Sequence, residues 1–161
     1  MNFKTADLCD EFTSIVQMGE PIFRDYGGIK TFGGPIATVK VFEDNVLVRR
    51  MLETPGEGRV LVVDGGGSKR CALLGDRLAG LGDQNGWAGV VIYGCLRDSV
   101  DVANIALGVK ALASVPKRSN KKGEGDTEIT LHFAGVTFTP GHYLYADPDG
   151  ILVAPKDLLQ E

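Results

Sequence analysis

Two short apolar runs with a helical pattern between them constrain the fold of this chain more than any other feature. Val60–Asp64 and Val90–Leu96 are rich in β-branched residues and lie next to glycines, which is typical of buried strands. Leucines recur between the two runs at three- and four-residue spacing, at Leu74, Leu78 and Leu81, and this spacing predicts a helix. The segment therefore predicts a strand–helix–strand unit.

The rest of the chain alternates between helical and extended patterns and then becomes rich in short strands. Before the first apolar run we predict a helix, an irregular glycine-rich stretch, a strand and a second helix, over residues 5–16, 18–35, 36–42 and 45–53. Asp44 or Asn45 is expected to cap the second helix. The last third predicts four short strands, over residues 127–133, 136–139, 142–145 and 150–153. This order of elements predicts the α/β class, as a single mixed α/β domain over residues 1–161.

Arg97 and Asp98 stand directly after the second apolar run. Ligand sites in α/β folds usually lie just past the carboxyl ends of strands. A guanidinium group presents a planar fork of donors that suits a carboxylate or an enolate, and an aspartate can hold a hard divalent cation through oxygen. The alternative is a surface salt bridge that caps a strand, which is the usual interpretation of an isolated Arg–Asp pair. The residues around the pair are needed to distinguish a ligand site from a surface salt bridge.

The segment around Asp76 favours a ligand site. Asp76 lies upstream of the pair, with twenty residues between it and Arg97. A helix is predicted to open at Gly75–Leu78, and N–H groups in a first helical turn have no partner inside the helix. The helix dipole also favours an anion at this end. The sequence thus offers an N–H cradle and an arginine with a carboxylate, which we expect at the same edge of the sheet. Together they suit chemistry on a small anionic 2-keto acid.

Composition limits the partners and the compartment. The formal net charge of −4 argues against a nucleic-acid surface, and no apolar run approaches the twenty residues of a membrane span. The first seven residues, MNFKTAD, carry an acid and no secretory apolar stretch, so a cytoplasmic location is expected. Three cysteines without CxxC spacing favour a reducing compartment and indicate neither a zinc site nor a disulfide. Since the chain has two histidines, we expect any metal to be oxygen-bound Mg²⁺ or Mn²⁺.

Several features near these motifs admit two interpretations. Cys95 lies two residues before Arg97 and could act as a nucleophile, but no histidine is near it in the sequence, so a buried strand residue is favoured. Gly65–Ser68 could form a nucleotide loop, but it lacks P-loop and dinucleotide-site spacing, so a structural turn is favoured. His132 and His142 are assigned structural or surface roles.

The basic residues of the chain form one cluster, at Lys117, Arg118, Lys121 and Lys122. A solvated loop is the favoured interpretation of this cluster, with an acidic partner or RNA as the alternative. Lys69 and Lys110 are expected on the surface, without a role as a Schiff-base lysine.

Seven short segments make the chain similar to a known family: residues 6–10, 32–35, 39–45, 60–68, 94–98, 135–138 and 145–147. Their order and spacing resemble the RraA-like family, which also contains the class II 4-hydroxy-4-methyl-2-oxoglutarate aldolases. The resemblance covers nearly the whole chain. It implies a layered, swivelling-type β/β/α fold and a ring-shaped homotrimer.

The resemblance also implies roles for the residues of the motif. Aldolase-active members carry an Asp, twenty residues, then Arg-Asp, and Asp76, Arg97 and Asp98 reproduce this pattern. The backbone of Gly75, Asp76, Arg77 and Leu78 would bind the substrate carboxylate, Arg97 would contact the pyruvyl portion, and Asp98 would anchor a divalent metal through a water-rich shell. Some members known as regulators of ribonuclease E lack the final Asp. Its presence here favours an enzyme.

The expected function is metal-assisted cleavage of 4-hydroxy-4-methyl-2-oxoglutarate to pyruvate. Arg97 and the metal would stabilise a pyruvate enolate, and Asp76 is the candidate base, directly or through water. Oxaloacetate would lose carbon dioxide through the same enolate, so decarboxylation is expected as a secondary activity. The alternative is a non-catalytic protein that binds and inhibits ribonuclease E.

Overall fold

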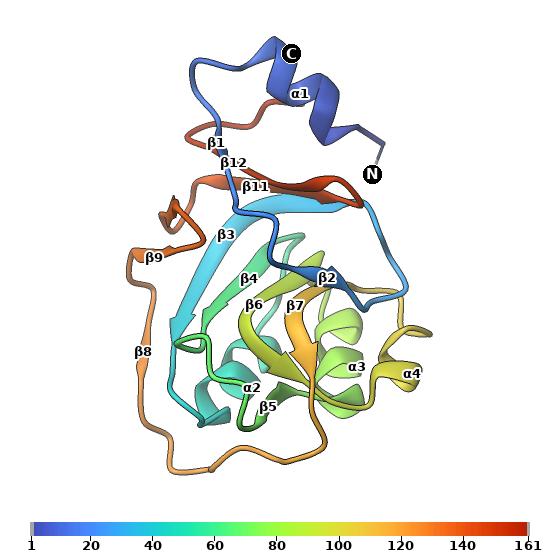
Figure 1. The fold of residues 1–161 in the computed structure, drawn as a ribbon, viewed down its shortest axis with the longest axis vertical. Helices are drawn as coiled ribbons and strands as arrows, with labels where there is room; N and C mark the ends of the chain where they lie inside the picture. Colours follow the sequence, from blue (N-terminus) through green and yellow to red (C-terminus); the bar gives the residue numbers. More distant parts are fainter. Residues whose placement is uncertain (1, 161) are drawn as a thin grey trace.

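A computed structural model describes residues 2–160 of the chain (Figure 1). Its four helices are α1 (Thr5–Glu11), α2 (Val46–Glu53), α3 (Asp76–Gln84) and α4 (Ser99–Val102). Its strands are β1 (Gln17–Met18), β2 (Arg24–Asp25), β3 (Phe32–Lys40), β4 (Val60–Asp64), β5 (Ala72–Leu74), β6 (Gly89–Leu96), β7 (Gly108–Ser114), β8 (Asp126–Thr127), β9 (Leu131–Phe133), β10 (Val136–Phe138), β11 (Tyr143–Asp147) and β12 (Gly150–Ala154). Within residues 2–160, none of the helices has the length and apolarity that a bilayer crossing requires.

A mixed sheet forms the middle of the molecule, in the order β1-β12-β11-β3-β4-β6-β7-β2. The four central strands, β3, β4, β6 and β7, are parallel, and the pairs toward both edges are antiparallel. β5 adds to the carboxyl end of β6, and β8 pairs with β3. Parallel neighbours end at one edge of the sheet, and this edge lies beside α2, α3 and α4 at the lower end of Figure 1.

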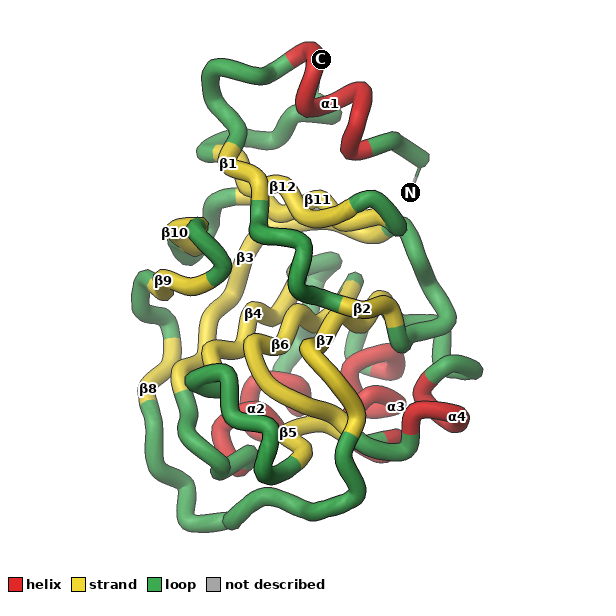
Figure 2. Tube along the Cα trace, in the orientation of Figure 1, coloured by secondary structure: helices red, strands yellow, loops and turns green. Residues whose placement is uncertain are grey.

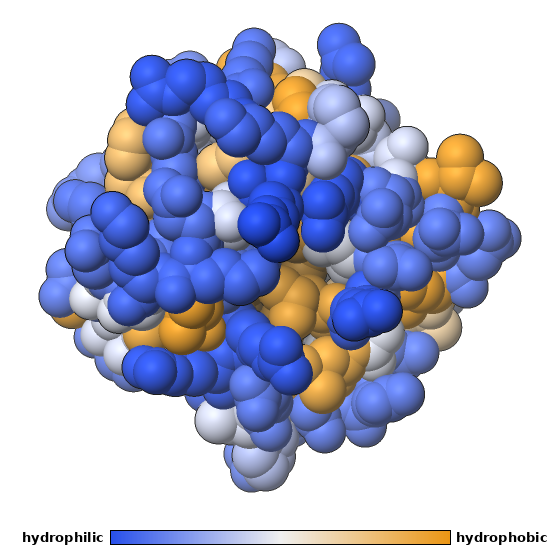
Figure 3. Space-filling view, turned by 90° about the horizontal axis from the view of Figure 1, so that it is seen from below, coloured by the Kyte–Doolittle hydropathy of each residue, from blue (hydrophilic) through white to orange (hydrophobic). Residues whose placement is uncertain are grey.

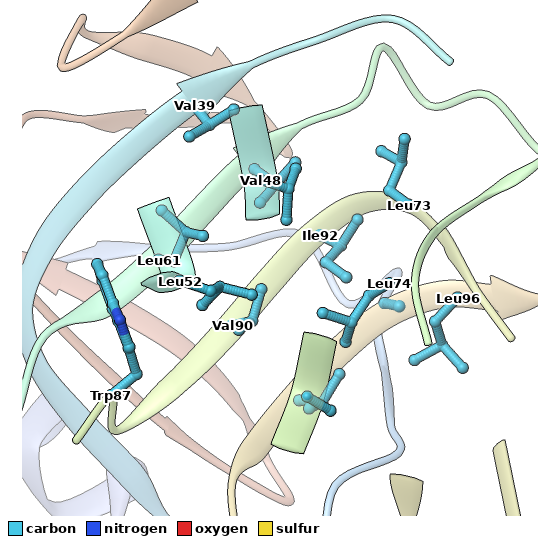
Figure 4. Packing of buried hydrophobic residues seen from close by; sticks show 14 of the residues in the cluster. Val39, Val48, Leu52, Leu61, Leu73, Leu74, Trp87, Val90, Ile92 and Leu96 are labelled. Atoms are coloured by element: carbon cyan, nitrogen blue, oxygen red, sulfur yellow. The ribbon is translucent and has the colours of Figure 1, made fainter. Parts of the chain in front are cut away.

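Both faces of the central strands are buried, which explains their continuous apolar sequences. On one face, Leu61 of β4 and Ile92 of β6 pack against Val48 and Leu52 of α2, and all four side chains are fully buried (Figure 4). On the other face, alternate residues of the same strands pack against β9, β10, β11 and β12. This arrangement confirms the predicted fold class, a mixed α/β domain with β and α layers.

The first helix packs at the opposite end of the molecule, over β11 and β12 (Figure 2). The predicted helix over residues 5–16 is too long, because α1 ends at Glu11. The Thr13 hydroxyl donates to the Cys9 carbonyl, and the following Ile15 and Val16 are β-branched, so the sequence beyond the helix supports it poorly.

The glycine-rich stretch predicted to be irregular contains the start of a central strand. β3 begins at Phe32, where the prediction placed its start at residue 36. Gly33 and Gly34 pair with Tyr145 and Leu144 of β11, so tertiary pairing overrides the weak strand propensity of glycine.

Strand β7 was not predicted, and Lys110 within it corrects the expectation of a surface lysine. The side chain is 3% exposed. Its Nζ donates to the Asp147 carbonyl at 2.7 Å and lies 3.0 Å from Asp25 Oδ1 of β2, in a charge contact outside hydrogen-bond geometry. The buried cation therefore joins β7 to the neighbouring β2 and to the end of β11.

Candidate active site

All six residues predicted for the site line one cleft, which has a volume of about 680 Å³. Gly75, Asp76, Arg77 and Leu78 form the start of α3, and Arg97 and Asp98 follow β6. Figure 3 views the molecule from below, toward the end where α2, α3 and β5 lie, and hydrophobic atoms show in a hollow among hydrophilic side chains. The sequence predicted that the N–H cradle of residues 75–78 and the Arg97–Asp98 pair would meet at one edge of the sheet, and this is confirmed. These two groups of residues are the two half-sites of the cleft.

The register of β5 and β6 places the two half-sites side by side. Leu74 pairs with Leu96, and the Arg97 N–H donates to the Leu74 carbonyl at 2.9 Å. Because Gly75 follows Leu74 directly, the first turn of α3 and the Arg97–Asp98 pair start from the same point on the sheet. β5 was absent from the sequence prediction, although it provides this alignment.

The Asp98 carboxylate contacts the N–H cradle directly. Its Oδ2 accepts a hydrogen bond from the Asp76 N–H at 3.1 Å. A Cβ atom on Gly75 would lie 2.6 Å from the same oxygen, so only glycine leaves room for the carboxylate. Asp98 itself has left-handed backbone angles, φ 58 and ψ 41, which aspartate and asparagine tolerate better than most residues. Part of the cradle expected to bind substrate is therefore occupied by the carboxylate expected to bind metal.

The cleft carries an excess of positive charge, although the whole chain is acidic. Six basic residues line it: Arg49, Arg50, Arg77, Arg97, Arg118 and Lys121. Three carboxylates line it as well: Glu53, Asp76 and Asp98. The ion pair recorded among these nine residues is Arg49 with Glu53, at 3.2 Å. A cleft with this balance concentrates anions from solution.

Sequence reasoning missed one wall of the cleft, which α2 and the loop over residues 117–124 form. Arg118 and Lys121 belong to the basic cluster predicted to be a solvated loop. Both are exposed, as that prediction requires, but they also line the cleft together with the motif residues. The basic cluster itself was the one signal in the sequence, because the residues that it contacts, among them Asn45 and Ala72, lie far from it in the chain.

Asp44 attaches this loop to the start of α2. Its carboxylate accepts hydrogen bonds from the backbone N–H groups of Lys122, Gly123 and Glu124 at 2.8, 2.9 and 3.3 Å, and from Val46 at 3.1 Å. Burial raises the pKa of Asp44, but the four N–H donors together outweigh it, and its pKa lies below the usual value. The sequence predicted Asp44 or Asn45 as the cap of α2. Asp44 is the one whose side chain accepts a hydrogen bond from the first residue of the helix, Val46.

The donor set fits a hard cation that keeps most of its water. Asp98 is exposed and Asp76 is half-buried, and both present carboxylates to the cleft. Residues 2–160 contain no group of three or more His, Cys, Asp or Glu side chains arranged to hold a metal. Mg²⁺ in proteins commonly binds through one or two carboxylates, with water and substrate completing its shell. Oxygen ligation by Asp98, with Asp76 nearby, fits that pattern.

The residues assigned to other roles lie where those roles require. Cys95 is fully buried in β6, and burial raises the pKa of its thiol, which disfavours a nucleophile. Gly65–Ser68 forms a turn. His132 is exposed and contacts Thr137 across the β9–β10 hairpin, and it is not among the residues that line the cleft.

Comparison with known proteins identifies the family. The RraA-like family model, described as Aldolase/RraA, matches residues 5–153. The chain belongs to the RraA-like family. A protein of Alkalilimnicola ehrlichii named "Putative 4-hydroxy-4-methyl-2-oxoglutarate aldolase" is 59% identical over 160 residues, covering 99% of each chain. A protein of Aromatoleum aromaticum with the same name is 60% identical over 159 residues, covering 99% of this chain and 100% of its own.

Solved structures of similar proteins carry two further names. A Geobacillus kaustophilus protein described as S-adenosylmethionine: 2-dimethylmenaquinone methyltransferase is 55% identical, with a TM-score of 0.97 over 99% of both chains. The RNA-processing inhibitor RraA from Thermus thermophilis is 42% identical, with a TM-score of 0.94 over 100% of this chain and 99% of its own. The fold of this RraA-like chain is thus found in proteins named for three different functions.

Proposed function

We propose that this protein is a metal-dependent aldolase that cleaves 4-hydroxy-4-methyl-2-oxoglutarate to pyruvate, with oxaloacetate decarboxylation as a secondary activity. The observation that carries the proposal is the direct contact between the two half-sites, in which Asp98 bonds to the first turn of α3 beside Arg97. The names of relatives more than 50% identical support the same reaction class.

Arg97 and the start of α3 would bind the 2-keto acid end of the substrate. The guanidinium fork suits the pyruvyl oxygens, and N–H groups of residues 75–78 that Asp98 does not engage suit the carboxylate. Mg²⁺ or Mn²⁺ held by Asp98 would supply a second positive charge next to the keto acid oxygens.

Cleavage requires a base and a site for the charge that develops. Asp76, directly or through water, would take the proton of the 4-hydroxyl group as that hydroxyl carbon becomes the carbonyl of one pyruvate. The electron pair of the breaking C3–C4 bond passes to C3 and its adjacent carbonyl, where Arg97 would stabilise the negative charge. A proton then adds to C3 and gives the second pyruvate. Arg97 therefore contributes most in the transition state.

The test is pyruvate release by the purified chain from 4-hydroxy-4-methyl-2-oxoglutarate and from oxaloacetate, with and without Mg²⁺. We expect release with the metal and loss of release in excess chelator. Asp98→Asn keeps a hydrogen-bond acceptor and a residue that tolerates left-handed angles, but it removes the charge. We expect this variant to need on the order of tenfold more Mg²⁺ for half-maximal rate. Full activity in excess chelator would contradict the metal-dependent mechanism.

A regulator that binds ribonuclease E is the second candidate function. The likeness to the RNA-processing inhibitor RraA supports it, at 42% identity and a TM-score of 0.94. The same experiment separates the candidates, because an absence of pyruvate release with several divalent metals would favour the regulator. The two functions can also coexist in one protein.

The cleft itself argues against a methyltransferase. S-adenosylmethionine carries a sulfonium cation next to the methyl group that it transfers. A cleft lined by six basic side chains and three carboxylates repels such a donor and attracts anions. The anionic keto acid is the better match.

A further inference from the structure

A pocket separate from the cleft lies beside β8 and β9, and we call it the β9 pocket (Figure 1). Its volume is about 510 Å³, and it shares no lining residue with the cleft. Lys40 and Asp64 are the last residues of β3 and β4, Tyr93 pairs with Asp64, and His132 comes from β9. The β9 pocket therefore lies at the carboxyl ends of parallel strands, where ligands commonly bind, and its volume is that of a small-molecule site.

Asp64 is a nearly buried carboxylate that lines the β9 pocket. The residue is 9% exposed, and its Oδ1 accepts a hydrogen bond from the Gly66 N–H at 2.9 Å. Within residues 2–160, Oδ2 has neither a hydrogen bond nor an ion pair, yet it is not enclosed. A carboxylate oxygen buried to this extent almost always has a partner. A ligand in the β9 pocket can reach Oδ2 and supply that partner.

The β9 pocket carries an excess of negative charge, in contrast to the cleft. Asp64, Glu124 and Asp126 line it, and Lys40 is the one lysine or arginine among its lining residues. The register of β3 and β8 places Asp126 opposite Lys40. The charges of Asp64 and Glu124 therefore have no compensating cation in the pocket lining, and such a pocket concentrates cations from solution.

Two aromatic rings complete the lining of the β9 pocket. Phe42 is 57% exposed, and a Cβ atom on Gly66 would lie 2.8 Å from its ring. A Cβ atom on Gly67 would lie 3.1 Å from the ring of Tyr93, so both rings lie against one glycine turn. The face of an aromatic ring attracts cations. The Arg70 guanidinium already lies 5.6 Å from the centre of the Phe42 ring.

We propose that the β9 pocket binds a small ligand with a guanidinium group. Asp64 Oδ2 would accept a hydrogen bond from this group, Glu124 and Asp126 would contribute charge, and the rings of Phe42 and Tyr93 would contact its planar face. A guanidinium group combines a fork of donors with a flat, weakly hydrated face that stacks on aromatic rings. A metal ion or a strongly hydrated ammonium group would use the carboxylates but gain less from the rings.

The experiment compares two ligands of the same shape, butylguanidinium and butylurea, of which the second is uncharged. Binding is followed by nuclear magnetic resonance, through the backbone amide signals of Gly66 and Gly125, which line the β9 pocket. We expect butylguanidinium to bind at least about tenfold more tightly, the effect of one hydrogen bond between charged groups. Butylammonium should bind more weakly than butylguanidinium. Neither Mg²⁺ nor a keto acid is present, so the result does not depend on the proposed aldolase activity.

Variants of the carboxylates test where the ligand binds. Asp64→Asn keeps an acceptor for the Gly66 N–H and removes the charge, and it should weaken binding about tenfold. Glu124→Gln with Asp126→Asn alters exposed residues and should weaken binding about threefold even if Asp64→Asn fails to fold. Glu11→Gln with Asp83→Asn is the matched control for charge, since both residues are exposed and neither lines the β9 pocket. This control should bind as the wild-type chain does.

Phe42→Leu tests the contribution of the aromatic ring. It keeps an apolar side chain and should weaken binding of butylguanidinium about threefold, with no effect on butylurea. Equal binding of butylguanidinium and butylurea would overturn the proposal, as would failure to bind either one. Tighter binding of butylammonium would reject the guanidinium ligand. Equal weakening by the Glu11–Asp83 control and the Glu124–Asp126 variant would show that net charge, and not the β9 pocket, attracts the ligand.

Discussion

Gly75 illustrates how a single missing side chain defines the site. Its backbone angle, φ −132, is one that alanine adopts freely, so conformational freedom does not explain the glycine. The reason is space, because a Cβ atom would lie 2.6 Å from Asp98 Oδ2. The residue with no side chain thus fixes the position of the carboxylate expected to bind metal.

We predict that Gly75→Ala displaces the Asp98 carboxylate and weakens metal activation about tenfold. Gly80→Ala is the matched control, since Gly80 lies in the same helix and an added Cβ there meets nothing within 4 Å. The control should keep wild-type activation and gain about 0.5–1 kcal/mol of stability. Activity as a function of Mg²⁺ concentration and urea unfolding measure both effects. Unchanged activation in Gly75→Ala would show that Asp98 does not need its present position.

At the scale of elements, one carboxylate makes several of the hydrogen bonds that join the start of α2 to the loop over residues 117–124. Asp44 is 3% exposed and accepts four backbone hydrogen bonds. Three of them come from the loop that carries Arg118 and Lys121. Asp44 is therefore a positioning residue, which acts on the cleft through the loop.

We predict that Asp44→Asn destabilises the protein by about 2 kcal/mol at pH 7, because the N–H donors lose a charged acceptor. The pKa of Asp44 is lowered in the folded state, so its contribution is complete above the unfolded pKa of about 3.9 and is lost as the pH falls through the folded pKa. The difference in free energy of unfolding between wild type and variant should shrink between pH 7 and pH 3 in urea titrations. A difference that stays constant over this range would contradict the prediction.

The elements that the sequence predicted well are those with strong periodic patterns. β4, β6 and α3 lie close to their predicted ranges, because both strands are buried on two faces and the helix repeats its leucines. The Arg97–Asp98 pair and Asp76 could be placed at one edge of the sheet for the same reason.

The elements that the sequence did not predict depend on contacts between distant residues. β7 contains Lys110, whose buried charge lies against Asp25 and the Asp147 carbonyl, both far from it in the chain. The basic wall of the cleft is formed in part by a loop that bonds to Asp44, about eighty residues earlier in the chain, and to Ala72 of β5. A local sequence pattern predicts neither the burial of Lys110 nor the position of this loop.

At the scale of the whole molecule, the candidate site is open on two sides. Arg97 and Asp98 line the main cleft and also a second hollow of about 350 Å³, together with Ser99 and residues 114–116. Val100 lies two residues from Asp98 and is 77% exposed. A developing negative charge needs shielding from bulk water, so we expect a neighbouring chain to cover this side. The ring-shaped homotrimer implied by the family resemblance would provide such a neighbour.

We predict a particle of about three times the 17.2 kDa mass of one chain in light scattering. Val100→Asp places a charge next to the second hollow and should lower the mass toward that of a single chain, with loss of pyruvate release, because burying an unpaired charge is costly. Leu159→Asp is the control, since Leu159 is 40% exposed and belongs to the segment that packs near α1, far from α4 (Figure 1). It should leave mass and activity unchanged. A wild-type chain that is monomeric and fully active would overturn the prediction that a second chain completes the site.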